Sequence, residues 1–242
     1  MAAWRLITTW GAAPDFNMGL DEALLMTPGL PPTVRFYSWK PDTLSLGYFQ
    51  KLAEVPGLER AGAVVRRITG GGAIHHVREL TFSISADLTL PLYAGGLNES
   101  YARVHGAIAL ALREVGVEAH LRGEHALRSD RAGTGMCFHH STPLDLVWDE
   151  RKGVGSAQRR RGGRVLHHGS IKLGSSALEG DIATLETQHR GMTPAAFAPL
   201  LQAALERELD MRLEASVPDA DERALAKELG PRYTSEEFVH SR

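Results

Sequence analysis

The stretch "RRITGGGAIHH", residues Arg66 to His76, is the part of the sequence on which the fold is decided. Two arginines lead into three consecutive glycines, and two histidines follow. Glycine tolerates positive φ and lets a ligand approach the backbone closely, and consecutive exposed N–H groups can form an anion-binding nest. The motif is neither G-x-G-x-x-G nor a P-loop, so the glycines alone leave a flexible hairpin turn equally open. In a regular strand, Arg66 and Arg67 would point to opposite faces, one toward a pocket and the other toward solvent.

The composition of the whole chain limits the classes of protein to consider. Its 242 residues are 43% hydrophobic and 23% charged, as in ordinary soluble globular proteins. The formal net charge of −2 gives no global field toward nucleic acid or an anionic membrane, so neither is an expected partner. No secretory signal and no membrane-spanning run of about 20 apolar residues is present. The single cysteine cannot form an internal disulfide, and we expect a cytoplasmic protein.

Hydrophobic periodicity predicts an α+β protein of one domain, residues 1–242, in which strands and helices segregate along the chain. "ELTFSISAD", residues 79–87, alternates apolar and polar side chains, which indicates a half-buried strand. Residues 193–242 are expected to be a helical C-terminal extension, with one helix ending at Gly230 and a last short helix capped by Ser235. The other expected strands are 4–10, 33–39, 43–49, 63–69, a hairpin over 144–158, and 165–173; the other expected helices are 15–26, with Asp15 as a possible N-cap, and 98–115.

Cys137 is the first candidate for chemistry, because it lies in the loop "GTGMCFHHSTP", residues 133–143. A lone cysteine is commonly a buried structural residue, whereas a nucleophilic one needs a nearby base or cation. His139 and His140 are candidate bases, although neighbours in sequence need not be neighbours in space. Lys152 either projects into a cleft or is the solvated end of a hairpin.

Two other patterns bear on partners and metals. The run "RRRGGR", residues 159–164, is either a solvated basic loop or a contact for a phosphate-bearing partner. The histidines at 75–76, 139–140 and 167–168 form adjacent pairs without the spacing of a zinc site. We therefore expect no metal and no bound cofactor.

Four stretches in chain order resemble the superfamily of lipoate–protein ligases, lipoyl octanoyltransferases and biotin ligases. They are "NMGLDEALL", "RFYSWKPDTLSLGYFQ", "RRITGGGAIHHVRELTFS" and "KGVGSAQRRRGGRVLHHGSIKL". The resemblance implies a central mixed or antiparallel sheet flanked by helices, with a long apolar slot for a lipoyl or octanoyl chain. The family lysine falls on Lys152. The implied substrate-binding residues are Arg67, Thr69, Gly70, Gly71, Gly72, His76, Gly155, Ser156, Ala157, His168, Gly169 and Ser170.

The choice between the activities of the superfamily depends on Cys137. A ligase adenylates a free acid with ATP, whereas a transferase takes a thioester from acyl carrier protein and holds the acyl group on a cysteine. Cys137 lies in a segment that resembles the Cys-Phe loop of cysteine-dependent octanoyltransferases. The resemblance therefore implies an octanoyltransferase with Cys137 and Lys152 as catalytic residues. Lys152 would favour the thiolate as a cation and then help to deprotonate the incoming amine.

The implied partners are octanoyl-acyl carrier protein and the lipoyl domains of 2-oxoacid dehydrogenases or the glycine-cleavage H protein. Backbone N–H groups near Gly70–Gly72, or after Ser156, would support an oxyanion. Arg66 or Arg67 would contact the donor's phosphopantetheine or carrier surface, or a nucleotide phosphate in a ligase.

Three alternatives stay open. In an ATP-dependent lipoate–protein ligase, Lys152 would contact the acyl-adenylate and Cys137 would be incidental. An octanoyl amidotransferase acting between lipoyl proteins would use the same residues. A non-catalytic lipoyl-binding paralogue is kept open by Val77 and Lys172, which depart from the family pattern.

Overall fold

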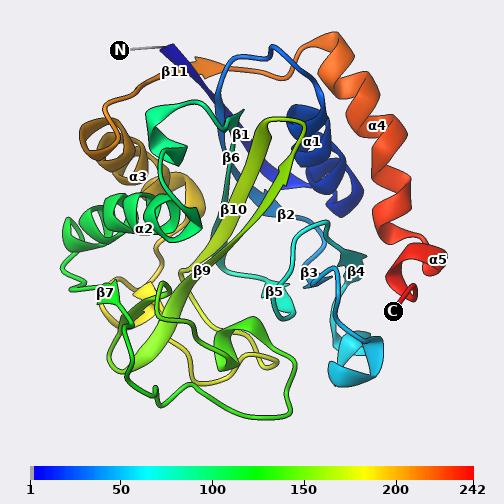
Figure 1. Ribbon diagram of the computed structural model, residues 1–242. Helices are drawn as coiled ribbons and strands as arrows, with labels where there is room; N and C mark the ends of the chain where they lie inside the picture. Colours follow the sequence, from blue (N-terminus) through cyan, green and yellow to red (C-terminus); the bar gives the residue numbers. More distant parts are fainter. Residues whose placement is uncertain (1–2) are drawn as a thin grey trace.

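The computed structural model describes residues 3–242 and contains two sheets flanked by helices (Figure 1). The large sheet has eight strands in the order β11-β1-β2-β6-β10-β9-β8-β7. β1 pairs in parallel with both β2 and β11, and the other pairs in this sheet are antiparallel. The predicted α+β class, with a mixed sheet flanked by helices, is confirmed.

The strands of the large sheet come from both ends and the middle of the chain. They are β1 (Ala3–Ala12), β2 (Thr33–Trp39), β6 (Glu79–Asp87), β7 (His120–Leu121), β8 (Leu146–Trp148), β9 (Arg151–Arg161), β10 (Arg164–Lys172) and β11 (Arg212–Ser216).

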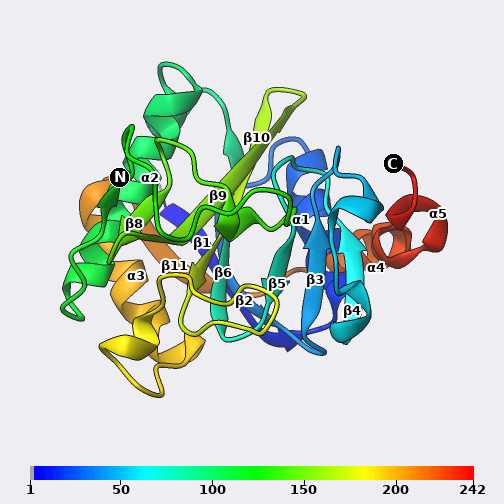
Figure 2. The same ribbon diagram turned by 90° about the horizontal axis from the view of Figure 1, so that it is seen from below.

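A second sheet has three strands in the order β4-β3-β5. They are β3 (Thr43–Leu46), β4 (Ala63–Arg66) and β5 (Ile74–His76). Figure 2 places this sheet beside the large one, next to α4. The predicted strands 43–49 and 63–69 are therefore real but end earlier, at Leu46 and Arg66, because the backbone turns there toward the glycine-rich segment.

Helices cover both faces of the large sheet. α2 (Leu97–Arg113) and α3 (Pro194–Glu208) pack on one face, and α1 (Pro14–Met26) and α4 (Ala220–Thr234) lie on the other; α5 (Glu236–Val239) follows α4 (Figure 1). α1 begins at Pro14 after Ala13, so Asp15 is in the first turn and is not the N-cap. Ser235 caps α5 as predicted. No helix within residues 3–242 is long and apolar enough to cross a membrane.

The prediction that residues 79–87 form a half-buried strand is wrong in its burial. In β6 both faces are buried, because α1 covers the polar face as well. Ser83 donates a hydrogen bond to Asp21 of α1, and Thr81 accepts one from the indole N–H of Trp39. Alternation identified the strand correctly, but its polar side chains face buried partners instead of water.

The region 193–242 is not purely helical, because β11 lies within it and pairs with β1. The helix predicted to end at Gly230 continues to Thr234. Gly230 does not end α4; it is the point where α4 crosses α1. A Cβ atom on Gly19 would lie 2.2 Å from the carbonyl oxygen of Ala226 and 3.0 Å from Cα of Gly230. Glycine is needed here for close approach of two backbones.

This crossing gives a prediction about stability. Gly19→Ala should lower the free energy of unfolding by about 1–3 kcal/mol, because the new methyl group collides with backbone atoms that cannot rotate away. Gly106→Ala in α2 is the matched control, since a Cβ there meets nothing within 4 Å. It should be neutral or stabilise by up to about 1 kcal/mol. Urea unfolding of both variants measures the difference; equal effects would contradict the role assigned to the crossing.

Candidate active site

The glycine-rich turn is joined directly to the loop that carries Cys137. Ala73 donates its N–H to the carbonyl of Gly135 (2.8 Å), and the N–H of Cys137 donates to the carbonyl of Ala73 (2.7 Å). A Cβ atom on Gly72 would lie 2.8 Å from the backbone nitrogen of Cys137. Gly72 therefore has to be glycine for the two segments to meet, and this contact fixes where the thiol lies.

Gly71 has a different requirement. Its φ is +95°, in the region that favours glycine. Its carbonyl oxygen approaches the backbone of Gly47 so closely that a Cβ there would lie 1.8 Å from it. The turn is thus packed against the loop after β3 as well as against the Cys137 loop.

Arg66 and Arg67 do point to opposite sides, but neither is solvated. Arg67 is buried and donates to the carbonyls of Gly70 (2.8 Å) and Gly72 (2.7 Å), so it holds the turn from inside. Burial lowers the pKa of Arg67 to about 10, which still leaves it charged at neutral pH. The buried Arg66 guanidinium donates to the carbonyls of Gly47, Gln50 and Val239. The expectation that Arg66 contacts a phosphate is wrong, because backbone oxygens surround it.

Cys137 and Lys152 meet at one end of the pocket described below. Cys137 is half-buried and begins a short 3₁₀ turn, Cys137–His139. The Lys152 ammonium, reaching in from β9, lies 3.4 Å from Sγ of Cys137 and donates to the carbonyls of Cys137 (3.0 Å) and His140 (3.1 Å). Lys152 therefore projects into the site and is not the solvated end of a hairpin.

Asp145 is the fourth partner of this ammonium. Its carboxylate lies 2.9 Å from Nζ of Lys152 and accepts the N–H of Thr142 (2.6 Å). Burial alone would lower the pKa of Lys152, but the charges of Cys137 and Asp145 outweigh it and the pKa is raised. Lys152 is therefore a cation at neutral pH. Asp145 is not among the residues predicted from the sequence; its only local signal is an acidic residue just after a Thr-Pro turn and just before a buried strand.

Neither candidate base faces the thiol. The ring of His139 donates to the carbonyl of Glu179 (2.7 Å) and contacts Oγ1 of Thr134 (2.9 Å). His140 meets Lys152 through its backbone carbonyl. No hydrogen bond within residues 3–242 joins either imidazole to Cys137, so the structure gives no support to a histidine base; the ammonium of Lys152 is the charged group that contacts the sulfur.

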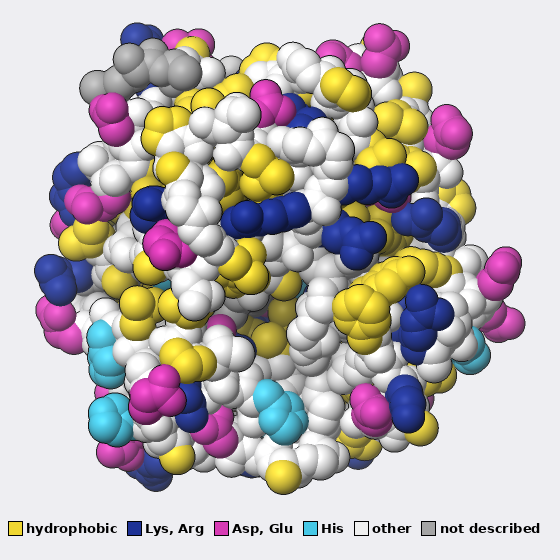
Figure 3. Space-filling model, viewed as in Figure 1, with side chains coloured by type: hydrophobic (Ala, Val, Ile, Leu, Met, Phe, Trp, Pro, Cys, Tyr) yellow, Lys and Arg dark blue, Asp and Glu magenta, His cyan; other side chains and the backbone are white. Residues whose placement is uncertain are grey.

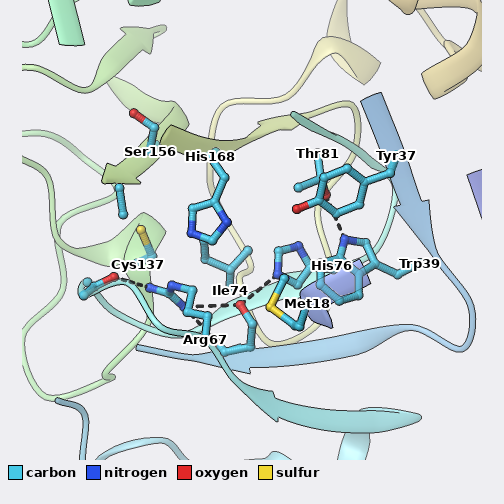
Figure 4. Close-up of a pocket in the computed structure, with 16 residues that line it drawn as sticks. Met18, Tyr37, Trp39, Arg67, Ile74, His76, Thr81, Cys137, Ser156 and His168 are labelled. Carbon is cyan, nitrogen blue, oxygen red and sulfur yellow. Dashed lines mark hydrogen bonds between the residues drawn. The ribbon is translucent and has the colours of Figure 1, made fainter. Parts of the chain in front are cut away.

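A mostly apolar pocket runs from Cys137 toward the side chains of β2 and β6 (Figure 4). Figure 4 shows Cys137 at one end and Met18, Tyr37, Trp39 and Thr81 at the other. Nine predicted substrate-binding residues line it: Arg67, Gly70, Gly71, His76, Gly155, Ser156, Ala157, His168 and Gly169. The lining residues that sequence analysis missed are Met18, Tyr37, Trp39, Ser45, Ile74 and Thr81.

Three predicted residues lie behind the wall instead. Gly72 packs on the Cys137 loop, as described above. Thr69 contacts Nε2 of His168 through its hydroxyl (2.6 Å), and Ser170 donates to Glu79. These residues support lining side chains without being among the lining residues themselves.

The lining histidines are fixed by buried carboxylates. His168 lies between Thr69 and Asp21, with Nδ1 3.3 Å from the Asp21 carboxylate. His76 contacts Glu79 (2.5 Å) through Nδ1 and stacks on Trp39 at a centroid distance of 4.2 Å. Lys172, which departs from the family pattern, is buried and pairs with Glu79 and Glu179 at 2.8 Å each. It therefore belongs to the support of the wall.

Ser156 contributes to the pocket, but its hydroxyl turns away from it (Figure 4). The hydroxyl contacts Nε2 of His105 (2.7 Å) and Nε2 of His167 (3.0 Å) under the sheet. Nδ1 of His105 donates to the carbonyl of Leu144, so its Nε2 is the acceptor. Burial lowers the pKa of both histidines. The hydroxyl of Ser156 on β9 is therefore held by two neutral imidazole rings, those of His105 and His167.

These features define a class of site: a thiol beside a lysine cation at the end of an apolar pocket, which suits covalent handling of an acyl chain. No group of three or more His, Cys, Asp or Glu side chains positioned for a metal is found within residues 3–242. The chain belongs to the lipoyl protein ligase A/B catalytic domain family, whose model matches residues 13–241.

The names of individual proteins similar to this chain are consistent with this family. The octanoyltransferase LipM of Moorella thermoacetica is 40% identical over 225 residues, covering 88% of this chain and 81% of the relative. The octanoyltransferase LipM of Kyrpidia tusciae is 32% identical, with 98% of each chain aligned. A T. acidophilum protein solved with bound lipoic acid has a TM-score of 0.81 at 22% identity, covering 100% of both chains. That identity shows the fold alone.

The Lys152–Asp145 pair gives a prediction about thiol reactivity. Asp145→Asn keeps an acceptor for Thr142 but removes the charge that raises the pKa of Lys152. The ammonium should then lose its proton at lower pH and stabilise the Cys137 thiolate less, so alkylation of Cys137 by iodoacetamide near neutral pH should become slower. Mass spectrometry of alkylation against pH measures this. An unchanged profile would mean that Asp145 only supports the loop.

The buried imidazoles give a prediction about acid stability. In the unfolded chain His105 binds a proton near pH 6.5, whereas in the folded chain its lowered pKa resists this. The stability is therefore complete above about pH 6.5 and is lost as the pH falls toward the folded pKa, by at most about 1.4 kcal/mol per pH unit and histidine. His105→Gln should flatten this slope in urea unfolding between about pH 5 and 7.5. Substitution of the exposed His120 is the control and should not.

Proposed function

We propose that this chain is an octanoyltransferase of lipoate biosynthesis and that Cys137 carries the octanoyl group as a thioester. The observation that carries the proposal is the pairing of Cys137 with the Lys152 ammonium at the end of an apolar pocket. Relatives named octanoyltransferase, at 40% and 32% identity, support acyl transfer as the reaction.

In the first half-reaction, Sγ of Cys137 attacks the carbonyl carbon of the octanoyl thioester. A new carbon–sulfur bond forms, the donor's carbon–sulfur bond breaks, and the donor leaves as a thiolate. The Lys152 ammonium favours the attacking thiolate by Coulomb attraction, and Asp145 keeps it protonated and in place. The N–H groups of Gly70, Gly71 and Gly72 have no acceptor within residues 3–242, which supports their use on the oxyanion.

In the second half-reaction, the neutral amine of the acceptor lysine attacks the thioester on Cys137. An amide bond forms, the amine loses a proton, and Cys137 leaves as a thiolate that again pairs with Lys152. The raised pKa of Lys152 argues that its part here is electrostatic, so the amine proton is released to solvent water while Cys137 keeps its thiolate form beside the ammonium. This differs from the expectation that Lys152 deprotonates the amine.

The proposed donor is octanoyl-acyl carrier protein, and the proposed acceptors are lipoyl domains of 2-oxoacid dehydrogenases or the glycine-cleavage H protein. The names of the relatives support the octanoyl group. The single thiol supports the cytoplasm as the place of reaction, because it must stay reduced to act.

Intact-mass analysis tests the covalent step. The chain mixed with octanoyl-acyl carrier protein should gain one octanoyl group that hydroxylamine removes, and Cys137→Ala should gain none. Transfer to a lipoyl domain should fall at least about a thousandfold in this variant, because the nucleophile is gone.

Circular dichroism and thermal unfolding show whether Cys137→Ala keeps the fold. An adduct that survives in a folded Cys137→Ala would contradict the proposal. So would loading that needs free octanoate and ATP, which would indicate a ligase.

A further inference from the structure

Four arginines near the pocket are not used by the mechanism. They are Arg159, Arg161, Arg232 and Arg242, and we call them the arginine rim. Arg159 and Arg161 are two residues apart on β9, so their side chains share one face of the strand. The side chain of Arg160 lies on the other face, where it donates to Gln158 and Ser100.

The rim is organised around two aromatic side chains. Arg159, Arg161 and Arg232 line one hollow with Tyr48 and Phe238. The guanidinium carbon of Arg159 lies 5.8 Å from the centroid of Tyr48, and that of Arg242 lies 5.1 Å from the same ring. The sequence brings these arginines from the β9–β10 hairpin and the chain's C-terminal segment to one tyrosine, which a solvated basic run would not require.

The rim carries positive charge without matching acids. Arg232 is paired with Glu22 at 2.9 Å. In the described part of the chain, Arg159, Arg161 and Arg242 form no ion pair, although the chain as a whole has a formal charge of −2. The acidic residues nearest in sequence, Glu236 and Glu237, are on α5, and neither pairs with the rim within residues 3–242. Arg159 and Arg161 are therefore free for a partner, whereas the guanidinium of Arg242 already donates to the carbonyl of Ser241 and the hydroxyl of Tyr48.

The rim also adjoins the pocket mouth. Ala157, which lines the pocket, is two residues before Arg159 on the same face of β9. Phe49, next to Tyr48, is 72% exposed, and a Cβ on the pocket residue Gly70 would lie 3.9 Å from its ring. In Figure 3, Lys and Arg side chains gather above the central hollow, over the β9–β10 hairpin and beside α4. A partner bound to the rim would therefore stand over the entrance that leads to Cys137.

We infer that the arginine rim is the docking surface for the acyl donor, an acidic carrier protein whose acyl group hangs on a phosphate-containing arm. Guanidinium groups bind carboxylates and phosphates with two parallel hydrogen bonds, and they act without being buried. Phe49 offers the exposed aromatic contact around which such interfaces form. The inference rests on the proposed function, because that function supplies a donor with this chemistry.

The donor fits the rim better than the acceptor does. The donor's thioester has to enter the pocket while its phosphate stays outside, and the rim places unpaired cations beside the mouth where that phosphate would stop. The acceptor reacts through the neutral amine of a lysine and brings no phosphate to this entrance, so its reacting group offers nothing for the guanidinium groups to bind.

The test compares Arg159→Glu/Arg161→Glu with the matched control Arg160→Glu, which reverses a neighbouring charge on the opposite face of β9. Loading of Cys137 is followed by mass spectrometry with three donors: octanoyl-acyl carrier protein, octanoyl-coenzyme A, and octanoyl-N-acetylcysteamine, which has neither protein nor phosphate. With the carrier protein, the rim variant should raise KM about tenfold with little change in kcat, and its rate should lose most of its salt dependence. With octanoyl-N-acetylcysteamine it should match wild type, which also shows that it is folded.

Octanoyl-coenzyme A separates the two parts of the donor. An intermediate loss with this donor supports contact with the phosphate as well as with the protein, and no loss supports contact with the protein alone.

Binding of octanoyl-acyl carrier protein is also measured by fluorescence anisotropy in a Cys137→Ala background, so that it does not depend on the covalent step. Weaker binding of the rim variant than of the Arg160→Glu control supports the inference even if no thioester forms and the proposed function fails. Unchanged binding and loading would overturn it, as would equal losses in the control. A loss confined to transfer from loaded Cys137 to a lipoyl domain would also overturn it, because the rim would then belong to the acceptor.

Discussion

The site depends on one backbone contact, between the glycine-rich turn and the loop that carries Cys137. Two hydrogen bonds join Ala73 to Gly135 and Cys137, and Gly72 has to lack a side chain for them to form. Arg67 holds the same turn from inside through the carbonyls of Gly70 and Gly72. The glycines therefore do not serve as a flexible turn. Because they lack side chains, the loop that carries Cys137 packs directly against their backbone. The ammonium of Lys152 contacts Sγ of Cys137 and the carbonyl oxygens of Cys137 and His140. The position of the Cys137 loop therefore also fixes where the ammonium meets the sulfur.

Next to this contact lies the apolar pocket, and pairs of charged side chains are buried around it. Burial of ionisable groups is unfavourable unless each is paired, and three groups of such pairs lie next to the pocket. Asp21 faces Arg35 and His168, Glu79 faces His76 and Lys172, and Asp145 faces Lys152. These pairs hold rings and side chains in fixed positions. Arg67, which lines the pocket and is charged, has no carboxylate partner and donates instead to the carbonyls of Gly70 and Gly72. An acyl chain therefore meets a mostly apolar surface, while the one cation that touches the sulfur is kept charged by Asp145.

Much of the fold and part of the site could be predicted from sequence, and the failures have physical causes. Clear periodicity predicts the strands and helices, the four motifs indicate Lys152 and most of the lining glycines, and the separate loop 133–143 indicates Cys137. Met18 and Trp39 lie within two of the four motifs, but nothing in the sequence shows that their side chains reach the pocket that Cys137 enters. Asp145 has only the weak local signal of an acidic residue after a Thr-Pro turn. Ser156 was assigned to the pocket, but the strand's alternation turns its hydroxyl under the sheet. The local pattern predicts a helix end at Gly230, because glycine is common just after helix ends; the structure instead places Gly230 against α1 at the crossing near Gly19, which no local pattern shows.

The parallel pairing of β11 with β1 has a consequence for the order in which the protein can be completed on the ribosome. β1 is made first, but the strand that covers its outer edge is residues 212–216, and α4, which packs on α1, comes later still. During most of synthesis one edge of the large sheet is open, and open edges invite pairing with other chains. Arg66 also lacks hydrogen-bond acceptors until late in synthesis, because two of them are the carbonyls of Phe238 and Val239. The nascent chain thus has a nearly complete pocket long before it has the segments that close its first strand.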